Sequence, residues 1–90
     1  MAKSKRHLRK TATAYIDELK ARFADLNLEA EAELGGFEGF DVWIRIELPS
    51  DFEDRIDDVI YATTELNFRF WDETGVSTTA TVEEKEPVHG

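Results

Sequence analysis

The chain has 90 residues, no cysteine and a formal net charge of −9. A chain of this length buries only about 60 to 65 % of its unfolded surface, so we expect one domain with one core. The lack of cysteine excludes disulfides, a thiol nucleophile and cysteine-ligated zinc or iron–sulfur sites.

The sequence contains no segment typical of a membrane or secreted protein. No run approaches the roughly 18 consecutive apolar residues that a membrane span needs. The basic N-terminus is not followed by the apolar core of a signal peptide. We therefore predict a cytoplasmic protein without membrane contact.

Positive charge is concentrated at the N-terminus. The first ten residues contain no acid and five basic side chains, Lys3, Lys5, Arg6, Arg9 and Lys10. The rest of the chain has the other six basic residues and all twenty acids, so its formal charge is −14. Such a body repels nucleic acid and favours basic partners, although the same acidity is also typical of an adaptation to salt or solubility.

The first predicted element is an amphipathic helix over residues 9–26. Its apolar stripe, at spacings of three and four, is Leu8, Ala12, Tyr15, Ile16, Leu19, Phe23 and Leu26. Asn27 follows the stripe and can adopt the left-handed conformation that ends a helix. Residues 1–10 fit either a flexible arm or the first turns of this helix, and we assign them to a basic flexible arm.

The apolar period then changes from helical spacing to two. Alternate residues are glutamates, Glu29, Glu31 and Glu33, which predicts a half-buried strand over residues 28–34. The glycines of residues 35–39 predict a hairpin to a second strand over residues 40–48. In that strand one face is apolar and should point at the helices, with Val42, Ile44, Ile46 and Leu48.

A proline and a serine mark the transition to a second helix. Pro49 cannot donate a hydrogen bond to a strand ladder, so it ends the strand. Ser50 and Glu53 have the spacing of a capping box, which predicts a helix that begins at Asp51. The apolar stripe continues at helical spacing as far as Phe70.

Residues 65–71 have two interpretations. Leu66 and Phe68 begin an alternation that is typical of a strand. Gly75, however, lies where the C-terminal cap of a helix requires a positive φ. We predict one long helix, and we retain an extra strand at 65–71, paired as a hairpin with 76–83, as the alternative.

The final predicted element is a strand rich in β-branched residues over 76–82. The order helix-strand-strand-helix-strand predicts an α+β two-layer sandwich, with two helices on one face of a three-stranded mixed sheet. The second helix would be longer than the strands, so its end should overhang the sheet, which makes a homodimer plausible. The predicted domain covers residues 11–84, with a flexible tail at 85–90.

The face of the sheet away from the helices is predicted to be polar with one tryptophan. It would present Glu29, Glu31, Glu33, Trp43, Arg45, Glu47, Ser77, Thr79 and Thr81. A tryptophan on a wet surface is a frequent anchor of a protein interface. We predict that Trp43, Arg45 and the three glutamates of the first strand bind a partner. In the alternative, Trp43 simply lies over the stem of Arg45.

The end of the second helix is the other predicted contact surface. Phe68 and Trp71 would lie there, exposed and available to a partner.

No arrangement of side chains points to catalysis. His7 lies in the basic arm and His89 is one residue from the end, so neither is held rigidly enough to act as a general base. Asp54, Asp57 and Asp58 have spacings that would let two of them share a cation, but no further ligand is nearby in the sequence. We expect no enzymatic activity, metal or cofactor.

Three functions fit these features. The first is a small acidic adaptor or regulatory module that binds a basic protein. The second is an inhibitor whose acids mimic nucleic-acid phosphates or neutralise a basic toxin. The third is weak nucleic-acid binding through the basic residues of the N-terminal arm.

Overall fold

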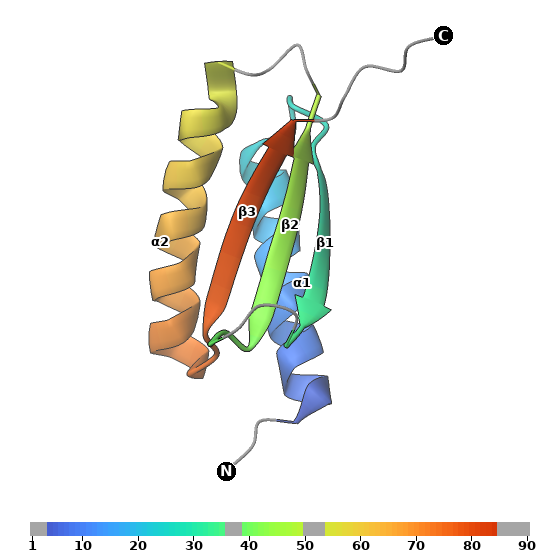
Figure 1. The fold of residues 1–90 in the computed structure, drawn as a ribbon. Helices are drawn as coiled ribbons and strands as arrows, with labels where there is room; N and C mark the ends of the chain where they lie inside the picture. Colours follow the sequence, from blue (N-terminus) through green and yellow to red (C-terminus); the bar gives the residue numbers. More distant parts are fainter. Residues whose placement is uncertain (1–3, 36–38, 50–53, 85–90) are drawn as a thin grey trace, which may run out of the picture.

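The computed structural model describes residues 4–35, 39–49 and 54–84. Its elements are α1 (Lys5–Arg22), β1 (Glu29–Leu34), β2 (Val42–Leu48), α2 (Ile56–Thr74) and β3 (Thr78–Glu84). Both helices lie on one face of a three-stranded sheet, so the molecule has two layers (Figure 1). The predicted α+β architecture and element order are confirmed.

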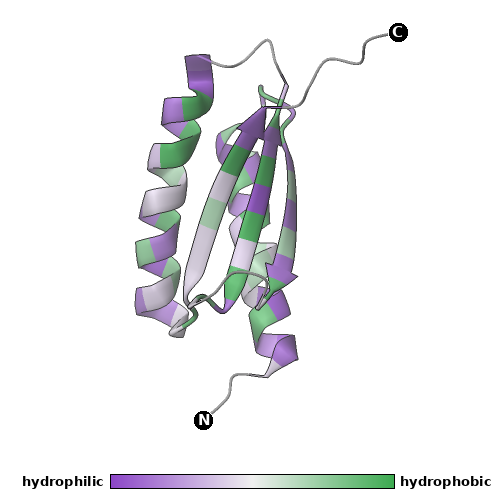
Figure 2. Ribbon diagram, viewed as in Figure 1, coloured by the Kyte–Doolittle hydropathy of each residue, from purple (hydrophilic) through white to green (hydrophobic). Residues whose placement is uncertain are grey.

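The sheet has β2 at its centre and the order β1-β2-β3. β1 pairs antiparallel with β2, so that Ala32 lies opposite Ile44, and β2 pairs parallel with β3, so that Ile44 lies opposite Ala80. β1 and β3 are therefore the two edges of this sheet. The hydropathy colours alternate along β1 and β2, whereas the first half of β3 is uniformly pale (Figure 2).

The core lies between the sheet and the two helices. Its fully buried side chains include Tyr15, Leu19, Leu26, Val42, Ile44, Ile46, Leu48, Val59, Leu66 and Val76. The predicted inward face of β2 is confirmed in full, because its four apolar residues have at most 1 % of their surface exposed. Burial on this scale is the main stabilising contribution in a domain of this size.

Helix α1 begins earlier than predicted, at Lys5 rather than near residue 9, and it also ends earlier, at Arg22 rather than near residue 26. The Ser4 side chain accepts a hydrogen bond from the His7 backbone N–H at 3.2 Å, which caps the helix. Half-buried Leu8 packs against the core and extends the apolar stripe by one turn. Residues 5–10, assigned above to a flexible arm, are therefore helical, and residues 1–3 lie outside the described part of the chain.

Helix α2 runs through residues 65–71, which excludes the alternative strand there. It ends at Gly75, whose φ of 72° is the left-handed conformation expected of a cap. The helix begins at Ile56 rather than Asp51, after a short turn of 3-10 helix at residues 54–55. The capping box of Ser50 and Glu53 falls outside the described residues.

Both helices extend beyond the sheet at one end. Figure 1 shows the N-terminal turns of α1 extending past one end of the sheet and the start of α2 extending past the tip of β3 at the other, while the rest of α2 lies alongside β3. α2 packs against β3 and α1, and α1 covers β1 and β2. Neither helix, within the described residues, is long and apolar enough to cross a membrane.

Candidate functional site

Trp43 is half-buried on the outer face of the sheet and makes contacts within the sheet. Its indole N–H donates to the Thr81 hydroxyl at 3.0 Å, across the β2–β3 pair. The Arg45 guanidinium lies 5.3 Å from the centre of the indole ring, within range of a cation–π contact. These contacts match the alternative given for Trp43 above, in which it packs over Arg45.

The glutamates of β1 meet Arg45 on the same face. Arg45 forms ion pairs with Glu31 at 3.2 Å and with Glu33 at 2.9 Å. The structure thus brings the predicted set together, with Glu29 at the far end of β1 facing Glu47 in register. Ser77 was also placed in this set, but it precedes β3, and its backbone N–H donates to the Asp41 carboxylate at 3.0 Å.

Replacing Trp43 by alanine should lower stability rather than remove a binding site. The substitution removes the hydrogen bond to Thr81 and the packing against Arg45, so we expect the free energy of unfolding to fall by about 1 to 2 kcal/mol. Urea unfolding monitored by circular dichroism measures this loss. An unchanged unfolding midpoint would contradict this stabilising role of Trp43.

The described basic residues of the N-terminus lie on the first turns of α1. Lys5, Arg6, Arg9 and Lys10 are all exposed there, and Lys3 lies outside the described residues. His7 joins this end to the end of α2, since its Nε2 lies 3.4 Å from the Thr74 carbonyl oxygen.

Helix α2 has a second apolar face that points away from the core. Four large side chains are exposed on it: Ile60 (47 %), Tyr61 (70 %), Phe68 (72 %) and Trp71 (56 %). They recur at helical spacing, with Thr64 at the middle of the stripe. Several large apolar side chains exposed along one side of a helix are typical of an interaction site on a small protein.

Two charged side chains in the middle of α2, Glu65 and Arg69, pair with α1. Arg69 donates to Glu18 of α1, and Glu65 accepts from Arg22 of α1 at 3.0 Å. Between residues 59 and 72, Glu65 and Arg69 are the only charged side chains of α2. The helix surface that lies next to β3 is therefore uncharged over about three turns.

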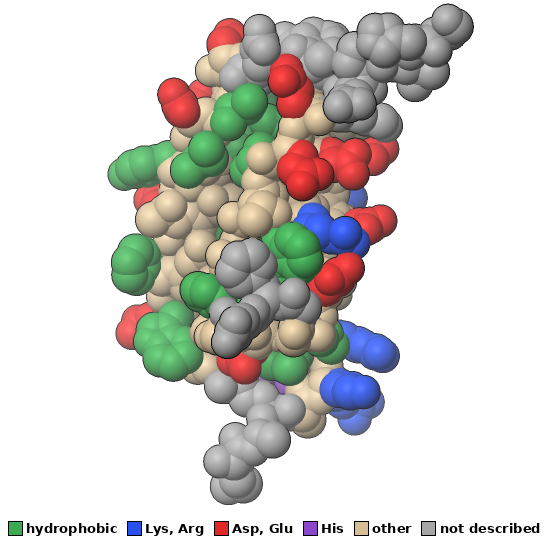
Figure 3. All heavy atoms as spheres, in the orientation of Figure 1, with side chains coloured by type: hydrophobic (Ala, Val, Ile, Leu, Met, Phe, Trp, Pro, Cys, Tyr) green, Lys and Arg blue, Asp and Glu red, His purple; other side chains and the backbone are tan. Residues whose placement is uncertain are grey.

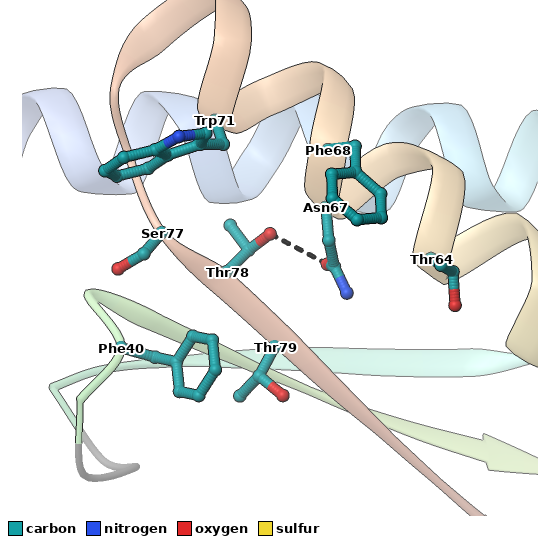
Figure 4. A pocket seen from close by; sticks show the side chains of 8 residues that line it. All are labelled: Phe40, Thr64, Asn67, Phe68, Trp71, Ser77, Thr78 and Thr79. Atoms are coloured by element: carbon teal, nitrogen blue, oxygen red, sulfur yellow. Dashed lines mark hydrogen bonds between the residues drawn. The ribbon is translucent and has the colours of Figure 1, made fainter.

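A groove of about 390 Å³ runs between this uncharged surface and the start of β3. It is lined by Phe40, Thr64, Asn67, Phe68, Trp71, Ser77, Thr78 and Thr79. In Figure 4, Phe68 and Trp71 extend from α2 on one side, and Phe40 and Thr79 lie across from them. We call this feature the α2–β3 groove.

Asn67 is the oriented polar group of the α2–β3 groove. Its Oδ1 accepts hydrogen bonds from the Tyr15 hydroxyl at 2.7 Å and from the Thr78 hydroxyl at 2.8 Å. Two hydroxyl donors on one oxygen fix the orientation of the amide, so its NH₂ group points away from Thr78 (Figure 4). The groove therefore presents two amide donors among apolar side chains.

Tyr15 anchors Asn67 from the core side. Its hydroxyl also lies 3.1 Å from the Thr63 carbonyl oxygen, so its single proton is shared between this oxygen and the nearer Asn67 Oδ1. Burial raises the pKa of the Tyr15 phenol well above its ordinary value, because a phenolate would be poorly solvated there. Tyr15 thus remains a neutral donor that holds Asn67 in place.

The two edges of the sheet differ in charge. β1 has a glutamate at every second position from Glu29 to Glu33, whereas residues 77–82, leading into and along β3, have none. In Figure 3 red and blue side chains gather over the β1 side, while mainly green and tan atoms cover the region between α2 and β3. Edge strands are commonly protected by charge, so β3 is the unprotected edge.

Sequence reasoning found part of this surface and missed the rest. It identified Phe68 and Trp71, but not the exposure of Ile60 and Tyr61 or the place of Asn67 in the groove. The available signal was the spacing 60, 64, 68 and 71, a second stripe offset from the core stripe. Among the described residues, no group of three or more histidine or acidic side chains is placed to hold a metal ion.

No protein-family model, curated protein or solved structure matches this chain.

Proposed function

We propose that the chain is a small, non-enzymatic, acidic protein-binding module of the cytoplasm, and that it binds its partner through the α2–β3 groove. The observation that carries this proposal is the exposed stripe of Ile60, Tyr61, Phe68 and Trp71, which is uncharged in a chain with 34 % charged residues. Depletion of charge and enrichment in aromatic residues are the signature of an interface centre.

The rest of the surface supports a basic partner. The body is strongly acidic, so a basic protein would be attracted before it reaches the groove. Apolar contacts in the groove would then supply most of the affinity. A homodimer through the same stripe is the competing assembly, and it would bring two acidic bodies together.

In the hypothesis of nucleic-acid mimicry, the partner binds the acidic side chains and not the groove. This hypothesis predicts competition with DNA or RNA and a steep loss of affinity in salt. Two of the acids concerned, Glu31 and Glu33, already share Arg45, which reduces the unbalanced charge of that face. This arrangement favours the groove as the main binding surface.

The test is affinity capture from the native host with immobilised protein, at low and high salt. We expect one or more basic proteins to be retained by the parent chain and lost with the double variant Phe68→Ser, Trp71→Ser. Both side chains are more than half exposed, so the variant should keep the melting temperature of the parent. Retention at high salt is expected, because apolar contacts are not screened.

The matched control is Ile16→Ser, which changes a partly buried side chain on α1 that does not line the α2–β3 groove. The same proteins should be captured by this variant at temperatures below its melting transition. Capture that is independent of Phe68 and Trp71 but lost at high salt would contradict the proposal and favour the acidic surface.

A further inference from the structure

We propose that the partner binds as a fourth strand along the open edge of β3, through an extended segment with an apolar side chain at every second residue and basic side chains between them. This inference rests on the proposed function and specifies the chemistry of the partner. It combines three observations: the direction of the β3 backbone groups, the uncharged side of α2 and the acidity of the surrounding surface.

The hydrogen bonds of β3 show which backbone groups face the open edge. The Val42 N–H donates to the Ser77 carbonyl oxygen at 3.1 Å, and the parallel register continues from there. In a parallel ladder a strand bonds one neighbour through every second residue. Thr79 and Thr81 therefore direct their backbone groups at β2, while Ala80 and Val82 direct theirs at the open edge.

The position of α2 provides one wall for an added strand. α2 packs mainly against β3, and it lies on the side of β3 away from β2 (Figure 1). Alternate side chains of an added strand would point toward this helix. There they would meet Phe68, Trp71 and Thr64, which require apolar partners.

The remaining side chains of the added strand would lie on the outer face of the sheet. That face carries Thr79, Thr81 and Glu83 on β3 and, on the neighbouring strand β2, Trp43, Arg45 and Glu47. Glu83 and the net negative charge of the body favour basic side chains there, and a second copy of the chain does not supply them, since β3 itself has no basic residue. The Asn67 NH₂ group adds two donors for oxygen atoms of the bound segment.

The experiment measures binding of a short synthetic peptide that alternates valine with lysine, with both ends blocked, by titration calorimetry against the full chain. We expect the alternating peptide to bind. Glutamate in place of lysine should weaken its affinity by about tenfold or more, and grouping the valines together should weaken it by about tenfold. Methylating the backbone nitrogens of one alternate set of peptide residues should abolish binding, whereas methylating the other set should not.

The protein variant Ala80→Pro tests the same edge from the other side. It removes an N–H that faces the open edge, a position at which edge strands tolerate proline. Binding should weaken by about tenfold or more, while Ala80→Ser, which keeps the N–H, should bind as the parent does. If Ala80→Pro lowers the melting temperature, the two methylated peptides decide the question without it.

The outcomes that would contradict strand addition are distinct from those that would contradict the proposed function. Equal binding of both methylated peptides, or binding insensitive to the grouping of valines, would overturn strand addition. If no peptide binds while host proteins are still lost with Phe68→Ser, Trp71→Ser, the proposed function stands and the strand is wrong. Concentration-dependent dimerisation that is abolished by Ala80→Pro would identify a second copy as the occupant and would also overturn this inference.

Discussion

Replacing Leu66 by alanine should lower the free energy of unfolding by about 3 kcal/mol, whereas replacing Phe68 by alanine should change it by less than about 0.5 kcal/mol. Leu66 has no exposed surface, and Phe68 is 72 % exposed. The difference arises because two residues along a helix turn by about 200°, so the two side chains lie on opposite faces. In a strand they would share one face and have similar effects.

Urea unfolding of the two variants, followed by circular dichroism, measures both values. A domain of 90 residues has a total stability of roughly 5 to 13 kcal/mol, so the loss at Leu66 is a large share of it. Val59→Ala is the matched core control, since Val59 is also fully buried on α2. Equal losses at Leu66 and Phe68 would contradict the helix over residues 65–71.

The fold was largely predictable because the apolar residues of most segments follow a single spacing, either helical or alternating. Residues 29–34 and 42–48 alternate strictly, and their partners in the sheet follow from the hairpin between them. The segment 65–71 satisfies both periods, so its apolar pattern alone could not decide between helix and strand. Gly75 favoured the helix, because a residue with positive φ, most often glycine, commonly follows the last helical residue.

The ends of helices and strands were harder to predict than their types, because each end depends on local contacts. The start of α1 depends on a hydrogen bond from the His7 N–H to Ser4, and serine is also common in unstructured segments. The +5 charge of residues 1–10 suggested a flexible arm, but like-charge pairs four residues apart on an exposed helix face cost only about 0.2 to 0.5 kcal/mol each.

The candidate site needed tertiary information that no local pattern contains. Trp43 could be placed on the outer face from its position in β2, but its contact with Thr81 depends on the parallel register of β3. The groove depends on β3 being an edge and on which side of α2 faces it. The exposure of Phe68 and Trp71 was predicted, but it arises at the sheet edge and not at an overhanging helix end.

High pH should destabilise the protein through Tyr15. Burial raises the pKa of this phenol above its ordinary value of 10.0, so in the folded state it keeps its proton where the unfolded chain loses it. The unfolded state then binds fewer protons, and stability falls as pH rises above about 10, by at most about 1.4 kcal/mol per pH unit. Below pH 10 the phenol is protonated in both states and contributes no pH dependence.

Urea unfolding at pH 9, 11 and 12 tests this expectation, with Tyr15→Phe as the decisive comparison. Between pH 10 and 12 the parent should lose about 2 to 3 kcal/mol more than Tyr15→Phe, which has no phenol to ionise. Tyr61→Phe removes an exposed hydroxyl and should follow the parent. If Tyr15→Phe loses stability equally steeply at alkaline pH, the loss comes from the ionisation of other groups. This outcome would also mean that Asn67 is not held by a buried neutral phenol.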